Sequence, residues 1–234
     1  MNKKKQTMLE AFVKKATMKQ YVYSNTLSTL NLFKEAIKEV VSEYQERYKN
    51  TEKLIPFEFK NRSDFEIELK FGGDILLFLM HTNVFEFPHE HEVMKTPYIK
   101  QEMARSYCGI IHIYNFLADS FKYNRVGDVG YLIGRVFINK EKHYFVEGKK
   151  ELGLLYDKFG KTKMNKKIAR DIIESSINFT VNFDLLTPPY KNVQEIYVED
   201  IKYAIDNMTL KTGKRLGFKF QADNINEDIK NKKK

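Results

Sequence analysis

Apolar side chains recur at helical spacing through the first 50 residues of the chain. Between Ser24 and Tyr48 they fall three or four positions apart, which places them on one stripe of a helix. Ser24 or Asn25 suits the N-cap of that helix. The stripe consists of Leu27, Leu30, Phe33, Ile37, Val40, Val41, Tyr44 and Tyr48. A shorter helix is predicted before it, with an inner face formed by Met8, Leu9, Phe12 and Val13.

The period of the pattern changes to two after residue 54. In residues 65–71, Phe, Ile and Leu alternate with Glu and Lys, as in a strand with one wet face. Gly72 and Gly73 fit a two-residue turn, and Ile75–Met80 is predicted as the next strand, buried on both faces. Val84–Phe87 adds a short strand that ends at Pro88.

Two further segments complete the predicted sheet. Residues 106–123 fit either a strand through Ile110–Tyr114 or a buried helix, and the strand is the favoured interpretation. Val129–Ile138 and His143–Glu147 are predicted as strands that a polar loop over 139–142 joins into a hairpin.

The helical period returns after Gly148. Helices are predicted over 150–158, over 164–177 with an extended segment after it to 183, and over 193–208, where Asn192 and Glu195 form a capping-box-like start. Residues 214–220 are predicted as a last strand. The order of elements predicts one α+β domain over 1–234. It has N-terminal helices (1–50), a central antiparallel sheet built from hairpins (54–148), C-terminal helices packed on the sheet (150–220) and a basic tail (221–234).

Composition narrows the class of protein. The chain has 234 residues, 42% of them hydrophobic, and one cysteine, Cys108. A lone thiol forms no internal disulfide, which favours a reducing compartment. The longest strongly apolar run, Ile75–Met80, is too short to span a bilayer. These features predict a soluble, cytoplasmic protein with no membrane partner.

The net charge of +9 is concentrated in three segments. Residues 1–20 and 211–234 carry +5 each, and residues 158–170 hold six basic residues and no acid. Such segments attract phosphate-rich partners, although solubilising tails and a solvated helix face give the same pattern. The leading hypothesis is a non-enzymatic module that binds nucleic acid or a nucleotide. Its predicted contacts are Lys161, Lys163, Lys166, Lys167, Arg170, Lys214 and Arg215.

A metal-dependent hydrolase is the second hypothesis, and it has two candidate sites. The stretch FPHEHEVMK places two histidines two positions apart, so both point the same way in an extended segment. Together with a third histidine and an acid they make a ligand set for a divalent transition metal: His81, His89, His91 and Glu86. The acids of the wet strands alternate with lysines as in metal-dependent nucleases, although any wet strand has this composition. These acids are Glu58, Glu66 and Glu68.

Three weaker patterns remain. Cys108 and His112 have the spacing of a nucleophile and its base, but a buried structural thiol is the favoured interpretation. Tyrosines interleave with arginines between residues 107 and 144, a composition that can stack bases and hold phosphates on a sheet, or fill a core. The stripe of residues 24–48 also fits a protein partner or a second copy of the chain, which makes an assembly protein the third hypothesis.

Overall fold

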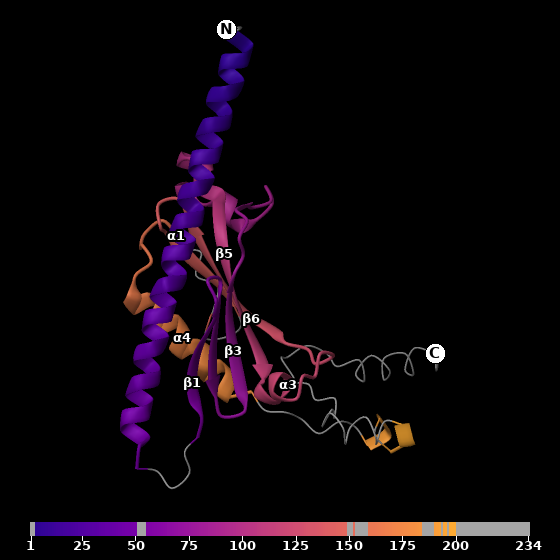
Figure 1. Ribbon diagram of the computed structural model, residues 1–234. Helices are drawn as coiled ribbons and strands as arrows, with labels where there is room; N and C mark the ends of the chain where they lie inside the picture. The colour runs from indigo at the N-terminus through magenta and orange to yellow at the C-terminus, as the bar shows by residue number, and fades with distance from the viewer. Residues whose placement is uncertain are drawn as a thin grey trace, which may run out of the picture.

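One helix, α1 (Lys3–Tyr48), runs along one face of the sheet in the computed structural model of the protein (Figure 1). The structure describes residues 3–50, 55–148, 152, 159–183, 190–192, 194, 195 and 197–199. The buried residues of α1 include Leu30, Phe33, Ile37 and Val41, all of which belong to the predicted stripe. The pattern of apolar positions therefore identified the face of this helix that packs on the sheet.

The sheet is antiparallel throughout and has the strand order β1-β2-β3-β5-β6-β7, with β4 beside the start of β5. Its strands are β1 (Phe57–Ser63), β2 (Glu66–Phe71), β3 (Asp74–Met80), β4 (Phe85–Glu86), β5 (Tyr107–Leu117), β6 (Tyr131–Asn139) and β7 (Tyr144–Gly148). The helical elements after α1 are η1 (Glu92–Lys95), α2 (Pro97–Gln101), η2 (Met103–Ser106), α3 (Ala118–Lys122), α4 (Lys166–Val181) and η5 (Tyr190–Asn192).

The predicted α+β fold class is confirmed, with an N-terminal helix, a central antiparallel sheet and a C-terminal helix that packs on the sheet. Gly72 adopts a φ of +54° in the turn between β2 and β3, a value that glycine reaches at little cost. Residues 107–117 form a strand, as favoured. Ile75–Met80 is buried on both faces as predicted except at Leu79, which is 39% exposed.

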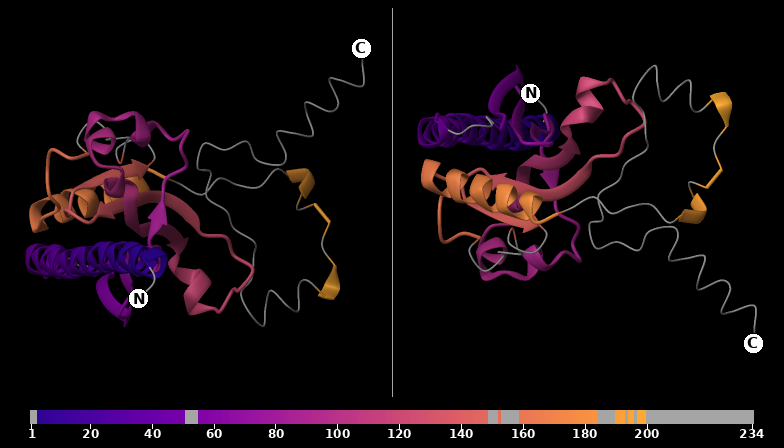
Figure 2. Two further views of the ribbon diagram at one scale, coloured as in Figure 1. Left: turned by 90° about the horizontal axis from the view of Figure 1, so that it is seen from above. Right: turned by 90° about the horizontal axis from the view of Figure 1, so that it is seen from below.

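The two faces of the sheet are covered differently. On the face that we call the inner face, α1 and α4 lie side by side (Figure 2) and bury the main core. The rings of Phe33 on α1 and Phe78 on β3 lie 5.4 Å apart at its centre. On the opposite, outer face, a smaller cluster forms beneath η1 and α2. It consists of Val93, Met94, Ile99, Cys108, Ile110, Phe137, Phe145 and Phe159.

The prediction of two N-terminal helices is wrong, because α1 is one helix of 46 residues. No glycine or proline interrupts residues 1–50, so nothing breaks the backbone at Ser24 or Asn25. Asn25 instead donates hydrogen bonds from its amide to the carbonyls of Asn139 and Lys140, at 3.1 and 2.8 Å.

The apolar residues expected on the inner face of the first helix are also not buried. Their exposed fractions are 60% for Met8, 40% for Leu9, 67% for Phe12 and 57% for Val13. Figure 1 shows the reason, since the first turns of α1 extend past the end of the sheet.

The C-terminal predictions are tested only in part. Helix α4 continues to Val181, so the extended segment predicted for 177–183 is wrong over most of its length. The buried positions Ile172, Ser176 and Phe179 are three or four residues apart, so the helical period continues through this segment. Apart from Leu152, the predicted helix over 150–158 lies outside the described residues, as do the strand over 214–220 and most of the helix over 193–208. Within the described ranges, no helix combines the length and apolar character that a membrane span requires.

A polar network fixes α2 and η2 to the turn between β6 and β7. The Tyr98 hydroxyl lies 2.7 Å from Oε2 of Glu141 and 2.7 Å from Nδ1 of His143, and it accepts a 2.8 Å hydrogen bond from the Asn139 amide. Arg105 donates to Glu141 at 3.0 Å. Burial lowers the pKa of His143 below its ordinary value of 6.5, while the nearby Glu141 carboxylate works in the opposite direction.

The closest approach of α1 to the sheet gives a first prediction. A Cβ atom built on Gly109 would lie 2.1 Å from Oγ1 of Thr26, a buried side chain that donates to the Val22 carbonyl. We expect Gly109→Ala to lower the free energy of unfolding by about 1–3 kcal/mol, because the helix must move away from β5. Urea denaturation measures this change. The control Gly127→Ala meets no atom within 4 Å and should change stability little; equal losses in both variants would contradict this packing.

The network around Tyr98 gives a second prediction. A histidine whose folded pKa is lowered adds stability that is complete above its ordinary pKa of 6.5 and is lost as the pH falls toward the folded value. The urea concentration at the midpoint of unfolding should therefore decrease as the pH is lowered from about 7.5 to about 5.5. The decrease should be smaller in the His143→Gln variant. The control is His89→Gln, because His89 is exposed. The pH dependence of its urea midpoint should match that of the wild type. A His143→Gln variant with the wild-type pH dependence would rule out this role.

Candidate functional site

The outer face changes in character from the β1 edge of the sheet to β5 in its interior. On β1 and β2 the outward side chains are charged: Glu58 pairs with Lys70 across the two strands, and Lys60 with Glu68. On β3 they are aliphatic, since Ile75, Leu77 and Leu79 follow in the same register. On β5 they are rings, with Phe116, Tyr114 and His112 opposite those three residues. Strand alternation thus sorts polar and apolar side chains on one continuous surface.

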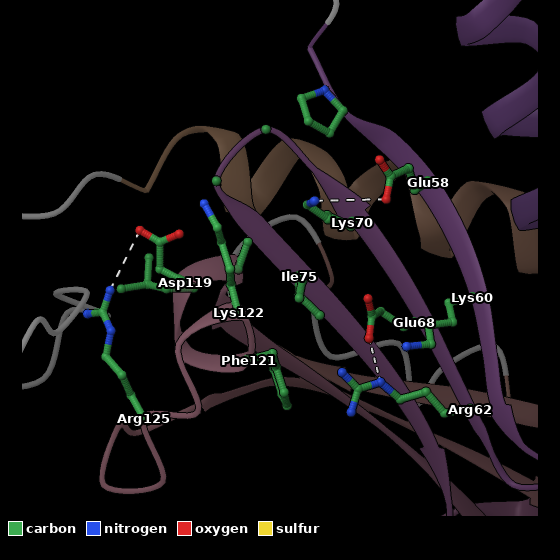
Figure 3. Close-up of a pocket in the computed structure, with 15 residues that line it drawn as sticks. Glu58, Lys60, Arg62, Glu68, Lys70, Ile75, Asp119, Phe121, Lys122 and Arg125 are labelled. Atoms are coloured by element: carbon green, nitrogen blue, oxygen red, sulfur yellow. Dashed lines mark hydrogen bonds and ion pairs between the residues drawn. The ribbon is translucent and has the colours of Figure 1, made fainter. Parts of the chain in front are cut away.

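A pocket of about 670 Å³ opens on this face between the β1–β2 hairpin and α3. Figure 3 shows side chains from both walls pointing into the space between them. The hairpin contributes Glu58, Lys60, Arg62, Glu68 and Lys70. The segment of α3 contributes Asp119, Phe121 and Lys122, followed by Arg125. We call this the hairpin pocket.

Positive charge exceeds negative charge in the hairpin pocket. Five basic and three acidic side chains line it, which gives a net charge of +2 at neutral pH. Such a concave, basic surface concentrates anions, because the low-dielectric walls focus the field of its cations.

The three acids of the pocket are each held by a cation. Glu68 accepts a charge-assisted hydrogen bond from Nε of Arg62. The Glu58 carboxylate lies 3.8 Å from Nζ of Lys70, and Asp119 lies 3.6 Å from the Arg125 guanidinium. These pairs neutralise the acids and fix the arginines in place. Arg62 and Arg125 each have a second acidic partner beside the pocket, Glu66 at 3.6 Å and Asp128 at 3.7 Å, so the positive excess of the lining rests on Lys60 and Lys122.

Two lysines remain available to a ligand. Lys60 is exposed and makes no hydrogen bond or ion pair with any described residue. Lys122 is exposed, and its Nζ lies 4.8 Å from the centroid of the Tyr123 ring. A hydrogen bond with the Tyr123 hydroxyl, with help from Asp119, raises the pKa of Lys122, so this side chain stays charged at neutral pH.

The basic residues predicted as anion contacts are not gathered at this pocket. Lys166 forms an ion pair with Glu39, and Arg170 holds both oxygens of Glu43 at 2.6 Å, so these two cations tie α4 to α1. Asn165 caps the start of α4 by accepting from the backbone N–H of Ile168. The other predicted contacts in the described part are exposed, namely Lys161, Lys163 and Lys167. Lys214 and Arg215 lie outside the described residues.

The predicted metal ligands are not brought together. Nδ1 of His81 accepts from the backbone of Asn83, and Nδ1 of His91 accepts from Val93 at the start of η1. His89 is exposed, and Glu86 accepts from the Tyr107 hydroxyl at 2.5 Å. No three His, Cys, Asp or Glu side chains within the described ranges are arranged to hold a metal ion.

The other candidate catalytic residues divide between two surroundings. Glu58 and Glu68 line the hairpin pocket, and Glu66 lies 3.6 Å from the Arg62 guanidinium. Cys108 is fully buried, and burial raises the pKa of its thiol, so the thiol stays protonated. The predicted burial of the Cys108 thiol among apolar side chains is confirmed.

On the α3 side of the pocket, the sequence singled out only Arg125, as part of the interleaved tyrosines and arginines. Asp119, Phe121, Lys122 and Arg125 lie about 50 residues from the hairpin in the chain and meet it only because β5 pairs with β3. The hairpin side had a detectable pattern, because Glu58, Lys60 and Arg62 alternate along β1.

Comparisons with known proteins assign no family: no family model, no curated protein and no solved structure matches the chain.

Proposed function

We propose that the protein is a non-enzymatic binding module for a phosphate-bearing partner, a nucleic acid or a nucleotide, which it holds in the hairpin pocket. The observation that carries this proposal is the net positive lining of that pocket, to which the β1–β2 hairpin contributes three cations and α3 with the turn after it contributes two. Arginine and lysine are the side chains that proteins use to bind phosphate. The buried lone thiol of Cys108 fits a reducing compartment, and we propose the cytoplasm as the place of action.

The ion pairs favour binding over hydrolysis. Catalysis by a metal-dependent nuclease needs carboxylates that are free to hold the ion. Glu58, Glu68 and Asp119 are each engaged by a lysine or an arginine, and they act as supports for those cations. The Arg62 guanidinium is thereby held at the pocket with its position already set, which reduces the entropy lost on binding, while Arg125 is largely buried between Asp119 and Asp128 and supports the α3 wall.

The two available lysines give the test of this function. We expect the double variant Lys60→Ala/Lys122→Ala to bind a fluorescein-labelled oligonucleotide roughly tenfold more weakly at low salt, a loss of about 1.4 kcal/mol. The slope of log K against log salt should become shallower by about 0.7 for each phosphate of a single strand that the variant no longer neutralises. Fluorescence anisotropy at several salt concentrations measures both quantities.

The matched control removes two exposed lysines from another basic segment, Lys161→Ala/Lys167→Ala. Both double variants lower the net charge by two, so general attraction would weaken binding equally in each. Equal losses would contradict the proposed site, and a larger loss in the control would place the contact on the segment before and within α4. A lack of oligonucleotide and tripolyphosphate binding by the wild type at low salt would overturn the proposed function.

A further inference from the structure

A row of aromatic rings leads along the outer face into the hairpin pocket. The rings of His112 and Tyr114 are stacked at 5.7 Å with an interplanar angle of 28°, and the ring of Phe116 follows at 6.4 Å from Tyr114. Phe121 on α3 meets Phe116 edge-on at 5.3 Å. The Arg62 guanidinium lies 4.3 Å from the centre of the Phe121 ring, inside the pocket. We call the four ring-bearing residues His112, Tyr114, Phe116 and Phe121 the ring row.

The ring row belongs to neither hydrophobic core. None of its rings is fully buried, and none is part of the main core or of the cluster beneath η1 and α2. Its neighbours across the strands, Leu79 and Leu132, remain 39% and 38% exposed. A row of rings with exposed apolar neighbours is a surface on which planar groups can stack.

We propose that the partner of the hairpin pocket is a single-stranded nucleic acid, whose phosphates contact the pocket and whose bases stack along the ring row. This inference rests on the proposed function and specifies its ligand. The ring row and the pocket form one surface, because Phe121 belongs to both.

The length of the row decides between classes of nucleic acid. His112, Tyr114 and Phe116 are alternate residues of one strand, so their Cα atoms span roughly 13 Å, which exceeds one base. A mononucleotide has one base and would occupy a fraction of the row. A duplex keeps the faces of its bases stacked inside the helix, where protein rings do not reach them. Only an unpaired strand offers several free base faces beside a chain of phosphates.

The charge of His112 is consistent with stacking. Burial lowers the pKa of His112, and the charges of Arg135 and His81 lower it further. The imidazole is therefore neutral at neutral pH and presents an uncharged ring. Arg135 itself is paired with Glu147 on β7, so the neighbouring strand adds little net charge at this end of the row. Base stacking at the row and phosphate binding at the pocket are thus separable.

Binding assays with a substitution at the centre of the row test this inference. The probes are a mixed-sequence fluorescein-labelled RNA strand, the DNA strand of the same sequence, the duplex of each, and inorganic tripolyphosphate. We expect both single strands to bind wild-type protein more tightly than their duplexes. Tyr114→Ala should weaken single-strand binding about five- to 150-fold, the range for loss of one stacked base. Tripolyphosphate binding, measured by calorimetry, should not change.

Three further variants make the result decisive. Tyr114→Phe keeps the ring and should bind as the wild type does. Tyr114→Leu keeps apolar volume without a ring, so it should show the loss even if the alanine variant fails to fold. The control Tyr21→Ala removes a tyrosine that is 62% exposed on α1 and should have no effect.

The outcomes separate the two proposals. The inference would be overturned if duplexes bound as tightly as single strands. It would also be overturned if folded Tyr114→Leu protein bound single strands with wild-type affinity. In both cases, binding of tripolyphosphate would still support the hairpin pocket as a phosphate site. Failure of every probe, tripolyphosphate included, would overturn both. A difference between the RNA and DNA strands would identify which of the two the surface prefers, and tight single-strand binding that disappears in Tyr114→Leu would support the inference in either case.

Discussion

The packing of α1 along one face of the sheet is the constraint on which the rest of the structure depends. The contact of Thr26 with Gly109 sets how closely the helix approaches β5, and the contact of Phe33 with Phe78 fills the space beside it. Helix α4 packs next to α1 on the same face and is held there by the ion pairs of Lys166 and Arg170. Both long helices of the described chain therefore cover one side of the sheet.

One-sided packing leaves the outer face to short elements. The cluster beneath η1 and α2 covers the end of this face near Cys108, and α3 stands at the end near Phe116. Between them the hairpin pocket and the ring row share a surface of charged, aliphatic and aromatic side chains. Its composition follows from strand alternation, because each residue that points away from the main core points toward this surface.

The sequence was sufficient to predict the elements whose period is regular over several turns or pleats. The stripe of Leu30, Phe33 and Ile37 and the alternation in β2 each identified an element and its buried face. The same reasoning failed at Ser24, where a residue suited to an N-cap occupies the middle of a helix. Capping preferences are worth about 1 kcal/mol, which an uninterrupted packed helix outweighs.

The candidate site was harder to predict, because it depends on tertiary pairing. Lys166 and Arg170 had the composition of an anion site, but acids on α1 lie within ion-pair distance of them. The histidines at 89 and 91 are close in sequence, yet His91 caps η1 while His89 is exposed. The cations of the hairpin pocket come from segments that only the pairing of β3 with β5 brings together. The pairing of two strands that are distant in the chain cannot be predicted from the residues of either strand alone.

Side-chain oxidation footprinting with an oligonucleotide bound tests the central claim, that the outer face is the binding surface, most directly. Hydroxyl radicals modify exposed side chains, and mass spectrometry then measures how far the ligand protects each one. We expect protection of Tyr114, Leu79 and Phe121, while Met8 and Phe12 on α1 react as they do in the free protein. Protection confined to α1 and α4, with the ring row still fully reactive, would contradict the account.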